Sequence, residues 1–331
     1  MIFSLCACGG KGKISDETKK DNKGGQQNQS QDQGDSQSNT QGDGASTVED
    51  MIEKYHQSEG RNVKAYLLLG IDKGGEASEV DAAYGTGQND GIYIIAVDND
   101  NKKSSVLQIN RDTYADIKVY DAFGKALSVE KNNLSMAYTY GFGAEDSCEC
   151  AEAAISDFLH GLKFDGYVAI YYDAISPVVD TVGGVDITIK EDLTSISPEF
   201  VKGANVHMDG ESSYKFCRAR KGVGDGSNEG RMDRQRTFLN SFLGTCRAVI
   251  KQRSSVINDM YNASSPYIVS NLSSGELCNI AALALSYSDG GIVTLKGENE
   301  FVTENGKTYC NFIVDDNNLN SILKDLFALE K

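Results

Sequence analysis

Residues 65–71 read AYLLLGI, a continuous apolar run that ends at Asp72. A short apolar run without polar alternation is typical of a β-strand that is buried on both faces. Two similar runs follow at residues 92–97 (IYIIAV) and 105–109 (SVLQI), separated by a turn at 99–102. We therefore expect three strands in the interior of one sheet.

Helical segments alternate with further strands in the next part of the chain. Apolar residues recur at helical spacing in residues 147–159 and 174–182, and Gly183-Gly184 follows the second segment as the expected C-terminal cap. Residues 167–172 and 185–189 have the composition of strands. This order predicts an α/β fold with a mixed central sheet sandwiched by helices.

Charged side chains stand at the ends of the first three strands. Asp72 ends the first strand, Asp90 precedes the second, and Arg111 and Asp112 follow the third. Each one alone is an ordinary cap or turn residue, but the ligands of open α/β sheets bind at strand ends. Two neighbouring carboxylates repel each other unless a cation lies between them. We therefore interpret Asp72 and Asp90 as candidate ligands of Mg²⁺, which commonly keeps water and phosphate as its other ligands.

Arginines are concentrated in residues 210–236, which read GESSYKFCRARKGVGDGSNEGRMDRQR. The chain has a formal net charge of −16 and nine arginines, and five of those arginines fall in this stretch. They are Arg218, Arg220, Arg231, Arg234 and Arg236. Arginine presents a rigid fork of donors that suits phosphate and carboxylate, so the stretch indicates an anion-binding site.

The second half of this stretch begins a helix near residue 231. Arg231, Arg234 and Gln235 share one face of that helix by their i, i+3 and i+4 spacing. Free N–H groups and the helix dipole favour an anion at such an N-terminus. The structural alternative is a solvated basic face, paired with the acidic residues that lie between the arginines.

The overall composition limits the class of ligand. A pI near 4.7 argues against a nucleic-acid surface, which needs a basic footprint, so we expect no nucleic-acid partner. Three scattered histidines form no metal-ligand pattern, and no stretch is long and apolar enough to span a bilayer. The six cysteines from Cys148 onward lack the spacing of a zinc site, and their pairing stays open.

The N-terminus indicates export. Residues 1–10 (MIFSLCACGG) resemble the truncated remnant of a bacterial lipoprotein signal with Cys8 as the lipidated residue, although a chance apolar start is the alternative. Residues 11–50 are rich in Gln, Asn, Ser, Gly and Asp, which predicts a disordered linker. We expect the main domain at residues 51–250 and a C-terminal α+β extension packed on it at residues 251–331. In this extension we expect helices at 275–287 and 319–329 and a strand pair around 291–302 and 308–314.

Eight short motifs in a fixed order resemble the LytR-CpsA-Psr family of bacterial cell-envelope phosphotransferases. They cover about residues 64–249, and none of them is specific alone. The motifs are Leu67-Leu68-Leu69-Gly70-Ile71-Asp72, Asn89-Asp90, Ile109-Asn110-Arg111-Asp112-Thr113, Ala137-Tyr138-Thr139-Tyr140-Gly141, Gly183-Gly184-Val185, Gly210-Glu211, Arg218-Ala219-Arg220 and Gly230-Arg231-Met232-Asp233-Arg234-Gln235.

The resemblance implies an α-β-α sandwich with a cavity for a lipid tail. We expect this apolar cavity beside the arginines, lined by residues of the helices at 151–162 and 238–249. Such proteins transfer a glycopolymer with its phosphate, as in teichoic acid or capsule attachment, from an undecaprenyl diphosphate carrier to peptidoglycan. The implied location is the outer face of the bacterial cytoplasmic membrane, where the lipid anchor at Cys8 would hold the chain at the membrane surface.

The resemblance also implies roles for individual residues. Asp72 and Asp90 are implied as Mg²⁺ ligands, and Asp112 as a group that transfers a proton or orients Arg111. The implied catalytic residues are Arg111, Asp112, Arg218 and Arg220. The residues implied to bind the diphosphate are Arg111, Arg218, Arg220, Arg231, Arg234 and Gln235.

Two positions depart from the family pattern and leave alternatives open. Gln88 stands where the family often has an arginine, and Asn132-Asn133 stand where it often has a lysine. The loss of two cations also suits a protein that binds or senses polyprenyl diphosphate lipids without transfer. Hydrolysis of the diphosphate by water is a further alternative.

Overall fold

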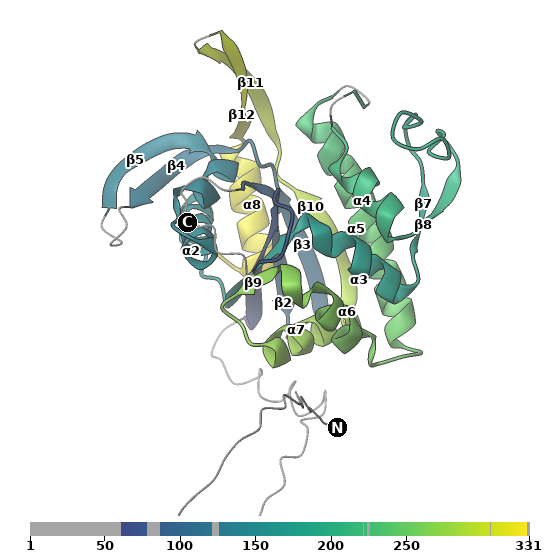
Figure 1. Cartoon of the computed structure of the whole chain (residues 1–331). Helices are drawn as coiled ribbons and strands as arrows, with labels where there is room; N and C mark the ends of the chain where they lie inside the picture. The colour runs from purple at the N-terminus through teal and green to yellow at the C-terminus, as the bar shows by residue number, and fades with distance from the viewer. Residues whose placement is uncertain are drawn as a thin grey trace, which may run out of the picture. The chain divides into compact units, whose positions relative to one another are not determined.

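A six-stranded sheet with helices on both faces forms the centre of the molecule (Figure 1). The structure is a computed structural model that describes residues 61–77, 87–120, 126–220, 222–223, 226–304 and 306–329. The strands are, in spatial order, β10 (Ser288–Thr294), β3 (Lys103–Ile109), β2 (Asn89–Asp98), β1 (Val63–Ile71), β6 (Gly166–Tyr171) and β9 (Ile268–Ser270). The three strands predicted first are β1, β2 and β3, each slightly longer than expected.

The sheet is mixed, as predicted. β2 pairs antiparallel with β1 and β3, whereas β1 pairs parallel with β6 and β3 pairs parallel with β10. In this register Ile71 lies opposite Asn89, and Ile92 lies opposite Ile109. The charged residues that follow β1, begin β2 and follow β3 therefore meet at one end of the sheet.

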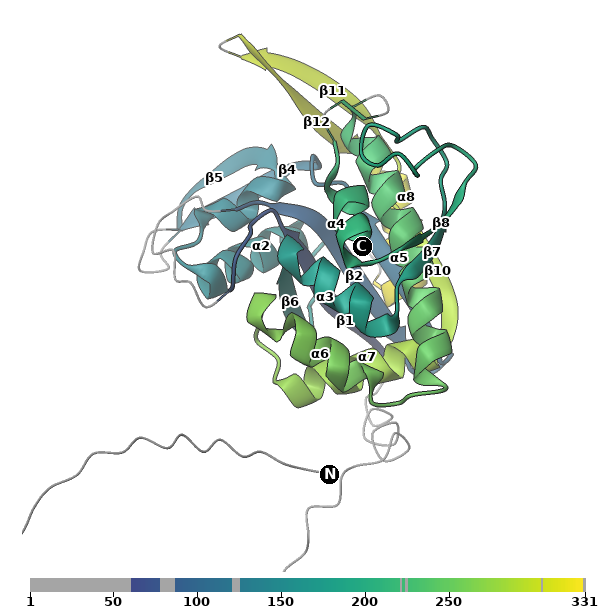
Figure 2. The ribbon, with the colours of Figure 1, turned by 45° about the vertical axis from the view of Figure 1, so that its right-hand side comes forward.

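Side chains of β1 alternate between two buried layers. Leu67, Leu69 and Ile71 belong to a core that also contains residues of α2 (Ala144–Phe158) and α8 (Asp316–Phe327). Tyr66, Leu68 and Gly70 line a cavity on the opposite face. The helices over that face are α3 (Ile175–Val182), α5 (Asn228–Ile250), α6 (Val256–Ser264) and α7 (Ser274–Ser286) (Figure 2). The predicted α/β sandwich is thus confirmed.

A compact unit beside the sheet carries the arginine-rich stretch. α3 ends at Gly183, whose φ of 86° is the left-handed conformation of the predicted glycine cap. The chain then forms the antiparallel strands β7 (Val185–Thr188) and β8 (Asn205–Met208) and the helix α4 (Gly210–Arg218). A Cβ at Gly210 would lie 2.3 Å from the carbonyl oxygen of Ser176, so glycine lets α4 approach α3.

Two hairpins extend from the charged end of β3. The first pairs β4 (Tyr114–Tyr120) with β5 (Ala126–Asn133) and leads into the 3₁₀ segment η1 (Leu134–Tyr140). The second pairs β11 (Gly297–Glu304) with β12 (Lys307–Val314). The base of the β11–β12 hairpin joins the start of the β4–β5 hairpin through an isolated β-bridge between Phe312 and Thr113. Both hairpins project from the body of the molecule in Figure 1.

Residues 251–331 were predicted as an extension packed on the main domain, but two of their strands belong to the central sheet itself. β9 and β10 are the two edge strands of the central sheet, and α6 and α7 cover its cavity face. Leu319 and Leu323 of α8 belong to the main core. The described residues therefore form one compact unit that continues past residue 250. The predicted strand pair at 291–302 and 308–314 also changes, because β10 pairs with β3 and only β11 pairs with β12.

The N-terminal predictions concern residues outside the described part of the chain. These are the signal remnant at 1–10 with Cys8 and the linker at 11–50. Within the described ranges, none of the helices combines the length and the apolarity that crossing a bilayer requires. The six cysteines from Cys148 onward are all free thiols.

Candidate active site

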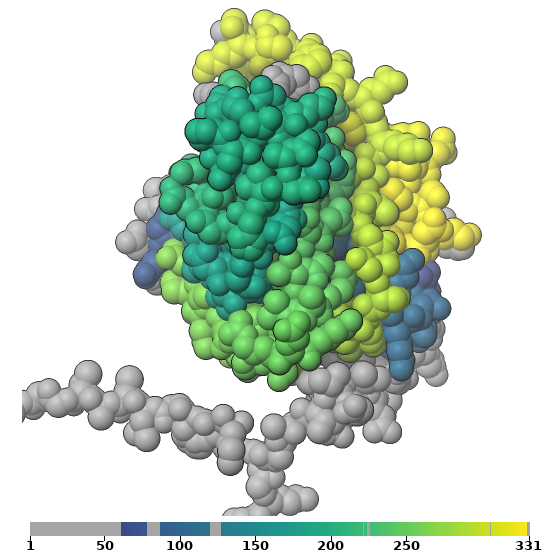
Figure 3. Space-filling model, turned by 90° about the vertical axis from the view of Figure 1, so that its right-hand side faces the viewer, coloured from purple at the N-terminus to yellow at the C-terminus, as the bar shows by residue number. Residues whose placement is uncertain are grey.

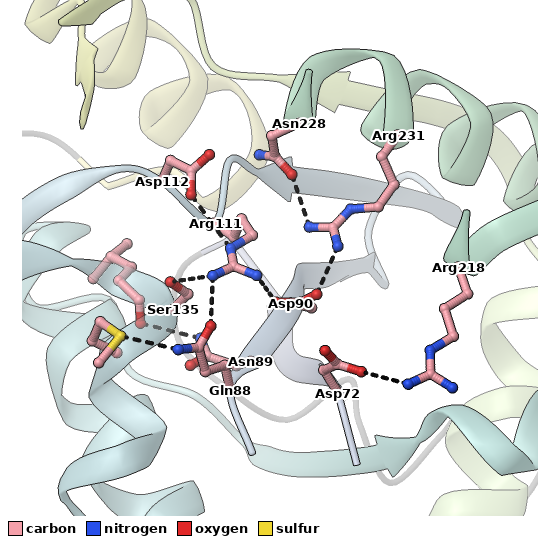
Figure 4. Close-up of polar contacts among 12 residues, drawn as sticks. Asp72, Gln88, Asn89, Asp90, Arg111, Asp112, Ser135, Arg218, Asn228 and Arg231 are labelled. Atoms are coloured by element: carbon pink, nitrogen blue, oxygen red, sulfur yellow. Dashed lines mark hydrogen bonds and ion pairs between the residues drawn. The ribbon is translucent and has the colours of Figure 1, made fainter. Parts of the chain in front are cut away.

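The charged residues at this end of the sheet form a cluster with Asp90 at its centre. Two arginines from distant parts of the sequence donate to the Asp90 carboxylate (Figure 4). Arg111 Nη1 donates to one oxygen, and Arg231 Nη1 donates to the other at 2.7 Å. Asp90 and Arg231 are each only 4% exposed. Removing one partner from a buried ion pair of this kind typically costs about 3–5 kcal/mol, so the arrangement is firmly held.

Neutral acceptors fix the other side of Arg111. Its Nη2 donates to Gln88 Oε1 at 2.6 Å and to Ser135 Oγ at 3.2 Å. Its Nε lies 3.3 Å from Asp112 Oδ1. Gln88 therefore gives Arg111 an acceptor at a position where an arginine would repel it. The departure from the family pattern at this position orients a guanidinium group of the cluster.

Asn228 holds Arg231 from the first turn of α5. Its Oδ1 accepts a hydrogen bond from Arg231 Nη2 at 2.8 Å, and its Nδ2 donates to Asn110 Oδ1 at 2.8 Å. Asn110 precedes Arg111, so this bridge connects α5 to the end of β3. The sequence prediction missed Asn228 and Ser135. The only available signal was the i, i+3 spacing of Asn228 and Arg231 on one helix.

Arg218 and Asp72 form a looser pair at the rim. Arg218 Nη2 lies 3.4 Å from Asp72 Oδ1, and both side chains are about half exposed. The guanidinium carbon of Arg218 lies 5.8 Å from the ring centre of Tyr172 and 5.6 Å from that of Tyr214. The aromatic faces stabilise the cation. Arg218 Nη1 also donates to the Tyr214 hydroxyl, so Tyr214 and Asp72 together hold this guanidinium group at the rim.

Arg220 completes the cluster through longer-range electrostatics. Its side chain is exposed, and its positive charge acts on both Arg111 and Asp112. Burial raises the pKa of the Asp112 carboxyl, although Arg111, Arg220 and Arg231 oppose the rise. The cluster thus contains four guanidinium groups and three carboxylates. These are Arg111, Arg218, Arg220 and Arg231 with Asp72, Asp90 and Asp112. The cluster has a small positive excess and a carboxyl with a raised pKa.

Arg234 and Gln235 lie outside this cluster. Arg234 is buried, and it donates to Glu191 Oε1 at 2.8 Å and to the carbonyl oxygen of Ala219. It therefore holds the chain between Arg218 and Arg220 and does not donate into the cluster. Gln235 accepts from the hydroxyl of Tyr93 at 3.3 Å and donates to the hydroxyl of Tyr172 at 3.4 Å. Gln235 is part of the cavity wall.

The cavity begins beside the cluster and is about 420 Å³ in volume. Gly70, Gly91, Tyr172 and Gln235 line the end near the charged residues, and the remaining walls are almost entirely apolar. The sequence predicted an apolar cavity beside the arginines, lined by residues 151–162 and 238–249. Residues of α5 do line it: Phe238, Leu239, Phe242 and Leu243.

The other half of that prediction is wrong. Residues 151–162 belong to α2 and its C-terminal end, and α2 packs on the opposite face of the sheet, where Ala151, Ile155 and Leu159 are buried in the main core. α3, α6 and α7 supply the remaining helical walls. Apolar periodicity shows that a helix is amphipathic, but it does not show which face of the sheet the helix covers.

Mg²⁺ would have two protein ligands here. Among the described residues, no three His, Cys, Asp or Glu side chains gather in a metal-binding group. Asp72 has one long ion-pair contact, whereas both oxygens of Asp90 accept from arginines. One or two carboxylates suffice for Mg²⁺ when water and substrate phosphate complete its shell. A metal at Asp90 would therefore take the place of an arginine donor, and phosphate and water would supply its remaining ligands.

Comparisons with known proteins agree with this fold. The sequence model of the LytR_cpsA_psr family matches residues 15–328. A Bacillus mycoides protein named polyisoprenyl-teichoic acid–peptidoglycan teichoic acid transferase TagU is 30% identical over 177 residues, which is 54% of this chain and 50% of the relative. The chain thus spans about half the length of the curated relatives it matches.

Two solved structures share the fold at low sequence identity. Protein gbs0355 from Streptococcus agalactiae has a TM-score of 0.65 at 21% identity, over 83% of this chain and 88% of that one. TagT bound to LIIa-WTA has a TM-score of 0.58 at 20% identity, over 80% of this chain and 89% of that one.

Proposed function

The chain belongs to the LytR_cpsA_psr family, and from this membership we propose that it transfers a phosphorylated glycopolymer from a polyprenyl diphosphate carrier to peptidoglycan. The Bacillus mycoides relative carries the name of such a transferase. One observation of this chain carries the proposal. The arginines that surround Asp90 stand at the polar end of an apolar cavity, so one site offers donors to a diphosphate and a wall to its lipid.

The donor substrate has two parts with opposite requirements. The polyprenyl tail gains free energy by leaving water, at about 25 cal/mol for each Å² of apolar surface buried. The diphosphate carries two negative charges, and each charge-assisted hydrogen bond to it contributes about 1.5–3 kcal/mol. The cavity takes the tail, and Arg111, Arg218, Arg220 and Arg231 hold the diphosphate.

The transfer step exchanges one phosphorus–oxygen bond for another. A sugar hydroxyl oxygen of peptidoglycan forms a bond to the phosphorus that carries the glycopolymer. The bond from that phosphorus to the bridging oxygen breaks, and the lipid monophosphate leaves with the bonding electrons. The arginines stabilise the charge that moves onto the leaving phosphate.

Asp112 takes the proton of the attacking hydroxyl in this proposal. Its carboxyl lies beside the guanidinium of Arg111, with Nε and Oδ1 3.3 Å apart. Burial raises its pKa, which makes its carboxylate a stronger base than a solvated aspartate. Arg111 connects the proton acceptor with the phosphate-binding arginines, because it contacts both Asp112 and Asp90.

We include Mg²⁺ as the cofactor, which Asp72 and Asp90 would hold together with phosphate oxygens and water. When bound, it would stabilise negative charge on the phosphates. The charge balance favours it, because a diphosphate turns the small positive excess of the cluster into a negative one. The same proposal places the protein outside the cytoplasm, anchored to the membrane surface through Cys8.

A transfer assay with a matched pair of variants tests this function. Purified protein is incubated with lipid-linked glycopolymer and peptidoglycan, with Mg²⁺ or with EDTA. Arg231→Gln should lower the transfer rate by about 100-fold or more, as loss of a charge-stabilising donor does in other sites. Arg247→Gln is the control, because Arg247 lies on the same helix and pairs with Asp289 away from the cluster. Equal loss in both variants, or full transfer in EDTA, contradicts the proposal.

A further inference from the structure

One face of the β11–β12 hairpin has no charged side chains. Residues directly opposite each other in an antiparallel pair share a face, which places Phe301 with Cys310 and Thr303 with Thr308. We call this side the Phe301 face; its residues are Asn299, Phe301, Thr303, Thr308, Cys310 and Phe312. The other face carries Glu298, Glu300, Glu304 and Lys307. In Figure 3 the hairpin, coloured yellow, stands at the top of the molecule.

The base of the hairpin is attached to the strand end that carries Asp112. The N–H of Phe312 donates to the carbonyl oxygen of Asp112 at 2.7 Å, and Asn133 Nδ2 donates to the carbonyl oxygen of Cys310 at 3.0 Å. A strand rises about 3.4 Å per residue, so Cys310 and its partner Phe301 lie about 7 Å along the hairpin from this attachment. Phe301 is therefore fixed near the active site.

The Phe301 face is directed toward the arginine side of the site. Asn299 Nδ2 donates to Glu229 Oε1 at 3.0 Å, and Glu229 lies two residues before Arg231 in the first turn of α5. The thiol of Cys310 donates to Asn299 Oδ1 at 3.4 Å and lies within electrostatic reach of Asp112 and Arg220. The face thus rises from the gap between the end of β3 and the start of α5.

The direction of attack places the second substrate on this side. In a phosphoryl transfer the attacking and leaving oxygens lie roughly in line on opposite sides of phosphorus. The leaving phosphate carries the tail that occupies the cavity, whose polar end is lined by Gly70, Gly91 and Gln235. Asp112 is not part of the cavity lining. The hydroxyl therefore approaches from the side of Asp112 and the hairpin.

The chemistry of the face suits a neutral sugar chain. Phe301 is 68% exposed, so its ring is available to a ligand. The negative face of an aromatic ring attracts the weakly positive C–H bonds of a pyranose. Thr303, Thr308 and Asn299 beside it offer hydroxyl and amide groups to sugar hydroxyls and acetamido groups.

We propose that the Phe301 face binds the glycan strand of the acceptor, beside the sugar whose hydroxyl reacts. This inference rests on the proposed function and assigns its second substrate to a surface. Phe301 is a positioning residue here, because it orients the strand and takes no part in bond exchange.

The test compares two aromatic residues on opposite faces of one hairpin. Tyr309 is 49% exposed and lies opposite Val302 on the charged face. Phe301→Ala should raise the KM for peptidoglycan about tenfold, equivalent to about 1.4 kcal/mol, with kcat and donor-lipid binding unchanged. Tyr309→Ala should match the wild type, and Phe301→Trp should restore the wild-type KM.

A binding experiment separates this inference from the transfer reaction. Glycan strands freed of peptides by an amidase are titrated into the wild type and both variants, and affinity is measured without a donor. Loss of affinity in Phe301→Ala alone supports the inference even when transfer cannot be followed. Equal affinity for the glycan strands in all three proteins overturns the inference. A change in oligomeric state that accounts for the Phe301→Ala effect overturns it as well. Absence of transfer with intact glycan binding counts against the proposed function instead.

Discussion

For single residues, the site depends on charges that the fold brings together from the ends of β1, β2 and β3 and from helices α4 and α5. Asp90 receives Arg111 from the end of β3 and Arg231 from α5, while Asp72 receives Arg218 from α4. The positions of Asp72, Asp90, Arg111 and Asp112 could be predicted, because strand ends in a sheet are neighbours once the strands pair.

Sequence spacing did not distinguish Arg234 from Arg231. Both arginines are buried near the N-terminal end of α5 at i, i+3 spacing, yet Arg234 donates to Glu191 and Ala219. Those partners lie in loops whose positions depend on tertiary packing. The functions of Gln88 and Asn133 were likewise invisible, because each depends on one particular acceptor or donor across the fold.

Donor binding should depend on individual arginines of the cluster. We expect Arg218→Ala and Arg220→Ala each to weaken binding of a polyprenyl diphosphate by about tenfold or more, the value of one charge-assisted hydrogen bond. Arg253→Ala is the control, because Arg253 pairs with Asp259 outside the cluster. Isothermal titration in detergent measures the three affinities. An equal loss in all three variants would indicate diffuse attraction and no built site.

The pH dependence of transfer should report on Asp112. Its carboxylate is the reactive form, so kcat/KM should rise with pH through a pKa above the usual aspartate range. The positive charge of Arg220 stabilises that carboxylate and lowers its pKa. Arg220→Gln should therefore move the acid limb of the profile to higher pH, and Arg253→Gln should leave it in place. A limb that stays fixed or moves to lower pH in Arg220→Gln contradicts the role of Asp112.

At the scale of elements, a pair of glycines keeps the polar end of the cavity open. Gly70 of β1 lies opposite Gly91 of β2, and both line the cavity close to Asp72 and Asp90. A Cβ at Gly91 would lie 2.9 Å from Cε2 of Tyr93, so a side chain there must displace the tyrosine ring. Both strands were predictable from their apolar runs, but the opening between them follows from their register.

Filling this opening should impair lipid binding. Gly91→Ala should lower the amount of polyprenyl lipid that the protein retains, because the displaced ring of Tyr93 narrows the entrance. Gly244→Ala on α5 is the matched control, since no atom lies within 4 Å of its new Cβ. That control should stabilise the protein by about 0.5–1 kcal/mol through helix propensity. Lipid retention and thermal unfolding are measured together, and unchanged retention in a folded Gly91→Ala protein contradicts this account.

At the scale of the whole molecule, the last part of the chain completes the site. β9 and β10 close the two edges of the sheet, α6 and α7 wall the cavity, and β11–β12 rises beside Asp112. The sequence predicted α7 and a strand pair in this region but treated the region as an extension packed on the main domain. β9 has three residues, too few for a sequence signal, and pairing between β10 and β3 depends on contacts across the fold. Local patterns specify elements, whereas their assembly into one sheet is a tertiary property.

The fate of the two phosphorus atoms of the donor distinguishes transfer to peptidoglycan from hydrolysis and from simple lipid binding. A lipid-linked glycopolymer is labelled separately at the lipid-side and polymer-side phosphate and incubated with the protein, Mg²⁺ and peptidoglycan. We expect the polymer-side phosphorus in the wall fraction and the lipid-side phosphorus in lipid monophosphate. Polymer-side phosphorus in free, water-soluble glycan would indicate hydrolysis, and both labels remaining together on the bound lipid would indicate a carrier; either result contradicts transfer to peptidoglycan.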